Sequence, residues 1–190
     1  METMTATELI AAFQAGRIDF TGQELQGIKL RGAHLNGIIL DGADLRDSDL
    51  SGSSLFKASL RGAMLNRAHL GILHDNDIDP NLDEIDMELG CVDLAQADLT
   101  GVFLNNAHLF RANLRGAILQ NADLRGAVLR QADLSGADLT GANFSSADLT
   151  EAHLNLETLK TANTTNATLK DIETGLRMAF KAEWIQSRVS

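Results

Sequence analysis

A large apolar residue recurs at every fifth position over most of this 190-residue chain. One series runs from Phe20 to Leu70 without a miss, and a second runs from Leu89 to Leu169 with a lapse at Thr164. A period of five fits neither an α-helix nor a continuous strand, because successive leucines would fall on different sides of either element. The pattern therefore predicts short extended steps separated by turns, with each leucine pointing into a shared core.

The other positions of each pentad are also specified. Two residues before the leucine stands a small or β-branched residue, which is alanine at every step from Ala107 to Ala152. One residue before it the position is usually polar, often Asp or Asn. Glycine is frequent two residues after the leucine, where a turn needs unusual backbone dihedrals. We expect the leucine and the small residue to point inward, and the other three positions to face solvent or form a corner. Coils of this kind stack at the usual separation of strands.

Several units read small residue, Asp or Asn, Leu or Phe, polar residue, then often Gly: ADLRG at 122–126, ADLSG at 132–136, ADLTG at 137–141 and ANFSS at 142–146. In this pattern the chain resembles the pentapeptide-repeat family, over about 28 pentads. The resemblance implies an all-β solenoid, a right-handed quadrilateral parallel β-helix with four pentads per coil and about seven coils. The four sides and the hand come from the resemblance, because the spacing alone does not specify them.

Both ends of such a coil need covering, and the chain offers a predicted helix at each end. Residues 5–15 place Leu9, Ile10 and Phe13 on one helical face, and Gly16 follows as a stop signal. The predicted organisation is a set of five segments: an N-terminal capping helix (1–17), a first repeat block (18–70), an interruption (71–88), a second repeat block (89–170) and a C-terminal helix (171–190).

The C-terminal segment 171–188 is predicted to be an amphipathic helix, in which Leu176, Phe180 and Trp184 recur at every fourth position. Two interpretations remain open. The helix either covers the last coil or forms a homodimer, since Trp184 and its neighbours exceed what one narrow end can bury.

The interruption holds most of the formal net charge of −10. Residues 71–88 contain seven acidic side chains and no Lys or Arg, whereas residues 18–70 contain six acidic and six basic ones. We expect a loop and then a short acidic helix near 80–89, carried outside the rod. The candidate interaction surface consists of its acidic side chains: Asp75, Asp77, Asp79, Asp83, Glu84, Asp86 and Glu88.

The acidic spacing superficially suggests a calcium loop, but the residue types do not fit one. Pro80 stands where such a loop needs Gly, and Asp86 stands where it needs a bidentate Glu. Two other interpretations stay open, namely a solvated excursion and a docking surface for a basic partner. We expect no metal and no cofactor.

The sequence also contains no recognisable set of catalytic residues. His34, His69, His108 and His153 each fall one residue before a core leucine, which is an outward position. The spacing places His69 and His108 on different coils, and the repeat geometry gives no pair the proximity of metal ligands. Cys91 has no basic neighbour in sequence to activate its thiol. The chain contains no nucleophile elbow, phosphate loop or dinucleotide fingerprint, so we expect no enzyme.

The basic residues of the second block are Arg111, Arg115, Arg125 and Arg130, and they alternate with Asp123 and Asp133. Such alternation predicts a charge-balanced surface, and without interleaved aromatic residues it does not favour direct nucleic-acid binding.

The sequence thus predicts a non-enzymatic scaffold that binds an unknown protein partner. We expect a cytoplasmic location, because no signal peptide or membrane-spanning segment of about 20 apolar residues is evident. The alternative is a DNA-mimicking inhibitor or protector of gyrase, a type II topoisomerase, as in family members of the fluoroquinolone-resistance type. Mimicry needs negative charge along the whole rod, which the balanced repeat blocks do not provide.

Overall fold

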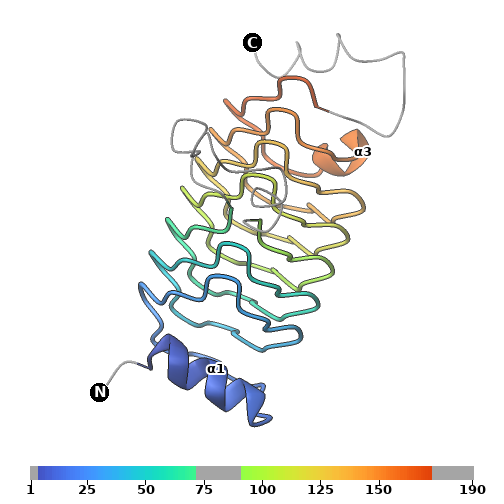
Figure 1. The fold of residues 1–190 in the computed structure, drawn as a ribbon. Coiled ribbons are helices and arrows are strands. Elements are labelled where there is room, and N and C mark those ends of the chain that lie inside the picture. The colour runs from blue at the N-terminus through green and yellow to red at the C-terminus, as the bar shows by residue number, and fades with distance from the viewer. Residues whose placement is uncertain (1–3, 72–90, 173–190) are drawn as a thin grey trace, which may run out of the picture.

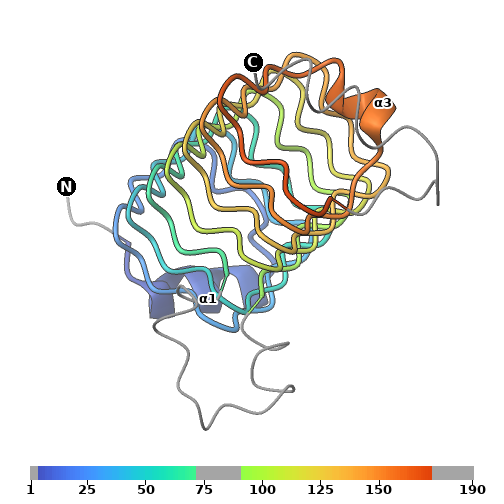
Figure 2. The same cartoon turned by 90° about the horizontal axis from the view of Figure 1, so that it is seen from above.

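In the computed structural model, which describes residues 4–71 and 91–172, the chain winds into a stack of coils that rises from the N-terminal end (Figures 1 and 2). Parallel backbone bridges join residues 20 positions apart, such as Asp19 to Ile39 and Glu24 to Asp44. Twenty residues are four pentads, so each coil has four steps. This register agrees with the number of sides that the resemblance implied.

The ladder continues across the interruption with a different sequence separation. Ser54 pairs with Asp93 and His69 pairs with His108, in each case 39 residues apart, which is one coil of 20 residues plus 19. The amide of Val92 donates a 3.0 Å hydrogen bond to the carbonyl of Leu70, so the two repeat blocks are joined directly. The acidic segment predicted between them lies outside the described residues.

Gly71 marks the point where the first block ends, and its position excludes a larger residue. A Cβ atom there would lie 2.4 Å from the carbonyl oxygen of Phe110 and 2.7 Å from its nitrogen. Because both contacts are with backbone, neither can move aside easily. The two blocks therefore approach at this corner as closely as backbone allows.

The predicted core is confirmed. Pentad leucines such as Leu40, Leu109 and Leu134 are fully buried, as are the residues two positions before them, Ile38, Ala107 and Ala132. Phe20 and Phe144 replace leucine without disturbing the pattern. Burying each leucine contributes roughly 1.5–3 kcal/mol. The lapse at Thr164 is also real, since this polar residue occupies a core position and is 5% exposed.

The corners explain why Asp or Asn precedes the leucine. The carboxylate of Asp98 accepts a 3.0 Å hydrogen bond from the backbone N–H of Thr100, and Asn143 accepts one from Ser145 in the same way. This Asx turn satisfies a corner N–H that lies outside the ladder between coils. One residue further on, the backbone takes a positive φ, which glycines such as Gly101 adopt without strain.

At the N-terminal end lies helix α1 (Ala6–Gln14), within the predicted range (Figure 1). Thr5 and Glu8 form a reciprocal capping box at its start. Leu9 is fully buried in the same apolar cluster as the pentad leucines, and Ile10 and Phe13 pack against that cluster. These are the three residues that the sequence placed on one face.

Near the C-terminal end the structure contains an element that the sequence did not predict. Helix α3 (Leu156–Leu159) begins after Asn155, whose side chain accepts a hydrogen bond from the amide of Glu157. Leu159 nevertheless remains fully buried, so the five-residue period passes through the helix unchanged. The predicted C-terminal helix with Leu176, Phe180 and Trp184 lies outside the described residues.

Candidate interaction groove

The candidate surface predicted from the sequence cannot be placed. Asp75, Asp77, Asp79, Asp83, Glu84, Asp86 and Glu88 all lie outside the described residues. The structure does show where this segment leaves and rejoins the rod, at Gly71 and Cys91. Cys91 lies 20 residues before Arg111, and Gly71 packs on the residue preceding Arg111. The corner that carries Arg111 is therefore next to the attachment point.

The sequence placed His69 and His108 on different coils, and the structure shows that these two coils are neighbours. The rings of His69 and His108 are stacked, with centroids 5.1 Å apart and planes 10° apart. Because the ladder pairs residues 39 apart across the interruption, His69 and His108 occupy equivalent positions on neighbouring coils. In the described ranges, 4–71 and 91–172, no group of three or more His, Cys, Asp or Glu residues is arranged to hold a metal ion.

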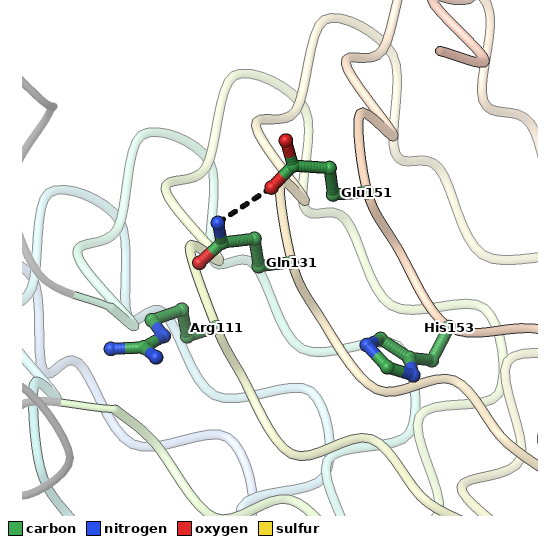
Figure 3. A pocket seen from close by; sticks show the side chains of 4 residues that line it. All are labelled: Arg111, Gln131, Glu151 and His153. Atoms are coloured by element: carbon green, nitrogen blue, oxygen red, sulfur yellow. Dashed lines mark hydrogen bonds between the residues drawn. The ribbon is translucent and has the colours of Figure 1, made fainter. Parts of the chain in front are cut away.

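A groove of about 320 Å³ runs along one corner of the second block, lined by Arg111, Gln131, Glu151 and His153 (Figure 3). The first three residues come from three successive coils and occupy equivalent corner positions. The Gln131 side-chain amide donates a 2.6 Å hydrogen bond to the Glu151 carboxylate. A cation, an amide and an anion therefore follow one another along the rod.

The backbone of this corner is strained. Arg111, Gln131 and Glu151 have φ values of 55°, 58° and 58°, and Asp171 continues the series at 51°. We call these four residues the polar corner. A residue with a Cβ loses about 1–2 kcal/mol in this left-handed conformation. Before the interruption, the same corner is formed by Gly32 and Gly52, which adopt positive φ without this cost.

A second corner of the rod provides the contrast, and we call it the glycine corner. From Gly22 to Gly141 all its members have positive φ, and only one of these six is not glycine: Gly22, Gly42, Gly62, Gly101, Asn121 and Gly141. The same backbone conformation is thus reached without strain elsewhere in the molecule. Left-handed residues other than glycine also occur at other corners, such as Asp47, Lys57 and Arg67, so strain alone does not single out the polar corner. The groove lined by its side chains does, and strained backbone at such a site is typical of a functional role.

The charge of Arg111 also distinguishes it from its neighbours. Arg115 pairs with Asp133 at 3.1 Å, and Arg125 pairs with Asp123 at 2.7 Å. The hydrogen bond from Arg125 holds the pKa of Asp123 below its usual value. Burial raises the pKa of Asp133, but hydrogen bonds from Ser135 and Arg115 outweigh it and lower the pKa. No such ion pair with another described residue involves Arg111.

Sequence reasoning treated the four arginines as one charge-balanced surface and missed the groove. The structure supports this interpretation for Arg115 and Arg125, which have acidic partners, but places Arg111 in a different setting. The signal was present in the sequence as long polar residues at 111, 131 and 151, where the repeat favours glycine. It becomes visible only once the 20-residue coil groups these positions on one corner.

Stacked four-step coils around a leucine core define a repeat solenoid. The chain belongs to the pentapeptide-repeat family: the family described as pentapeptide repeats (8 copies) matches residues 24–62, 40–71, 88–126 and 117–155, which together cover more than half of the chain. Members form right-handed quadrilateral β-helices and are generally structural or binding scaffolds rather than enzymes.

Solved structures show the same fold. The pentapeptide repeat protein Rfr23 from the cyanobacterium Cyanothece 51142 is 23% identical, with 88% of this chain and 95% of that chain covered and a TM-score of 0.51. QnrB1, a plasmid-mediated fluoroquinolone resistance protein, is 20% identical, with 82% and 76% covered and a TM-score of 0.61. At these identities the likeness extends to the fold alone. No curated protein matches the chain.

Neither α1 nor α3, the two helices in the described part of the chain, has the length and apolar character needed to span a bilayer.

Proposed function

We propose that this protein is a non-enzymatic scaffold that binds a protein partner at the polar corner. The observation that carries the proposal is the run of long polar side chains at left-handed positions around the groove. Glycine fits this backbone better, and the rod uses glycine at the same corner before the interruption. Arg111, Gln131 and Glu151 are present although their left-handed backbone costs free energy, and this favours a role in recognition.

The ladder between coils supports this role, because it holds the three side chains at fixed spacing. The amides of Arg111, Gln131 and Glu151 each donate to a carbonyl of the next coil, at 2.9, 2.9 and 2.8 Å. A partner therefore meets a surface that is already ordered, and it loses less free energy on binding than it would with a mobile loop.

The test is a triple substitution to glycine, Arg111→Gly, Gln131→Gly and Glu151→Gly, which removes the side chains and relieves the strain. Wild type and variant are immobilised and exposed to extract of the source organism, and bound proteins are compared by quantitative mass spectrometry. We expect at least one protein to bind wild type and to be lost from the variant. The matched control is Asn121→Gly at the glycine corner, which should retain it. Identical binding to all three proteins would contradict the proposal.

The acidic segment at residues 71–88 remains part of the hypothesis that this protein binds a protein partner. Its attachment points, Gly71 and Cys91, lie beside the polar corner, which supports a joint surface. Deleting residues 72–88 tests this separately. Loss of the same partner in the deletion and in the triple glycine variant would indicate one continuous surface, and loss in the deletion alone would assign recognition to the excursion.

A second candidate is a gyrase inhibitor or protector that mimics DNA, supported by the fold that the chain shares with QnrB1. The charge distribution weighs against it, since residues 18–70 are balanced and residues 89–169 contain eight acidic and five basic side chains. A supercoiling assay with purified gyrase, with and without a fluoroquinolone, decides this. No effect at micromolar protein would remove the candidate.

Dimerisation through the C-terminal helix also remains a prediction. Light scattering on the full chain and on a chain that ends after Leu169 measures it. A halved mass after truncation would support the dimer, whereas an unchanged mass would leave covering the last coil as the role of the helix.

A further inference from the structure

We infer that the polar corner binds a partner segment that carries one acidic and one basic side chain about 10 Å apart, the acidic one against Arg111 and the basic one against Glu151. This inference rests on the proposed function and adds the chemistry of the partner. It follows from the order of charges in the groove, from their separation, and from a second corner where the same charges neutralise each other.

The separation comes from the coil geometry. Arg111 and Glu151 are 40 residues apart, which is two coils, and neighbouring coils lie about 4.8 Å apart. Their backbones are therefore about 10 Å apart along the rod. In an extended partner, side chains on one face recur at every second residue, so residues i and i+2, about 6.6 Å apart, and residues i and i+4, about 13 Å apart, bracket this distance.

The residue between them keeps the two charges apart. At another corner, Asp47 and Arg67 occupy left-handed positions on neighbouring coils and form an ion pair, with Arg67 Nε 2.7 Å from Asp47 Oδ1. Each neutralises the other, so little charge is left for a partner. Gln131 occupies the intervening coil in the groove and prevents the equivalent pairing of Arg111 with Glu151.

Gln131 also orients the anion. Its side-chain N–H donates to one oxygen of Glu151, and the amide oxygen of Gln131 lies on the side of Arg111 (Figure 3). The carboxylate is thereby held in place while its second oxygen remains available to a donor. The Arg111 guanidinium extends away from Gln131, where its N–H groups can meet an acceptor.

This arrangement selects against partners of a single charge. A segment with two acidic groups would meet Glu151 and Asp171, and a segment with two basic groups would meet Arg111. Like charges placed opposite each other cost more than matched pairs gain, so the groove discriminates mainly through repulsion. The favoured segment therefore carries both signs.

The experiment selects peptides and then exchanges charges. A phage-displayed library of random peptides is selected on wild type and depleted on the Arg111→Gln, Glu151→Gln variant. We expect enriched peptides to share an acidic and a basic residue at constant spacing. From one such peptide, three synthetic probes are made with acidic–basic, acidic–acidic and basic–basic residues at the two positions, and their affinities are measured by fluorescence polarisation at low salt.

Wild type should prefer the acidic–basic probe by about tenfold. Arg111→Glu leaves only acidic charges at the polar corner and should shift the preference to the basic–basic probe. Glu151→Arg should shift the preference to the acidic–acidic probe. These shifts are independent of the direction in which a peptide lies, and a variant that merely fails to fold would lose all three probes. Circular dichroism confirms that each variant is folded.

Two outcomes separate this inference from the proposed function. The three probes could bind equally to the charge variants and yet not bind the triple glycine variant. The corner would then bind partners whatever the order of their charges, and only the present inference would be wrong. If the probes bind the triple glycine variant as tightly as wild type, both this inference and the proposed function are wrong. Failure to enrich any peptide with the charge pair also overturns the inference.

Discussion

The polar corner and the glycine corner have the same backbone conformation but opposite side chains. At both, the third residue of the turn has a φ between 50° and 71°. The glycine corner reaches this conformation without strain and presents almost no side chain. The polar corner accepts strain on four coils and presents a cation, an amide and two carboxylates. The comparison shows that this backbone conformation does not require polar residues. Binding to a partner therefore explains the polar side chains better than stabilisation of the rod does.

The strongest test of this comparison gives the glycine corner the side chains of the polar corner. The triple substitution Gly42→Gln, Gly62→Gln, Gly101→Gln should lower the free energy of unfolding by about 3 kcal/mol. A Cβ at these glycines meets nothing within 4 Å, so the loss measures backbone strain without steric overlap. Urea unfolding followed by circular dichroism provides the value. A loss below about 0.5 kcal/mol would show that the repeat tolerates long residues at any corner.

The converse change removes strain from the polar corner. We expect the triple glycine variant of Arg111, Gln131 and Glu151 to raise the free energy of unfolding by about 2 kcal/mol. The gain is smaller than the loss above because the hydrogen bond from Gln131 to Glu151 is also removed. Measured beside the capture experiment, this variant should be more stable and yet bind less. A less stable variant would mean that the polar side chains support the fold.

The turn that precedes the glycine corner can be weakened without altering φ. Asp138 accepts hydrogen bonds from the backbone N–H of Thr140 and from the side chains of Thr140 and Gln120. Asp138→Ala should cost about 1 kcal/mol at pH 7, whereas Asp138→Asn, which keeps an acceptor, should cost less. A cost equal for both substitutions would show that charge, and not the turn, matters.

The pH dependence of that cost follows from the pKa of Asp138. Hydrogen bonds, first from the Thr140 hydroxyl and then from Gln120, hold this pKa below its ordinary value of 3.8. The charged form is therefore favoured in the folded state, and its contribution is present above the ordinary value and lost as pH falls through the lowered one. The difference between wild type and Asp138→Ala should shrink as the pH falls below the ordinary value of 3.8, as measured by unfolding at each pH.

The smallest change in the free energy of unfolding is expected at Asn121, which is the exception within the glycine corner. Asn121 has a φ of 56°, and Asn tolerates left-handed backbone better than most residues. Asn121→Gly should therefore change the free energy of unfolding by less than about 0.5 kcal/mol. A large gain here would show that strain alone does not distinguish the two corners.

The sequence predicted the core, the N-terminal helix and the outward polar positions because each depends on local spacing. The stacking of His69 on His108 was missed because it depends on how the 19 intervening residues are accommodated. Helix α3 was missed because four helical residues fit within one pentad and leave Leu159 at its expected place. The polar corner was missed for a third reason: although the resemblance implied four pentads per coil, the arginines were compared along the sequence and not by positions 20 residues apart.

The junction at Gly71 has a consequence for how this molecule tolerates change. The close approach of Gly71 to Phe110 and the hydrogen bond from Val92 to Leu70 hold the end of the first block next to the start of the second. Doubling the length of a flexible insert adds only about 0.6 kcal/mol of closure entropy. The junction is therefore a natural splice point, where a foreign peptide or reporter could be grafted onto the rod and displayed beside the groove.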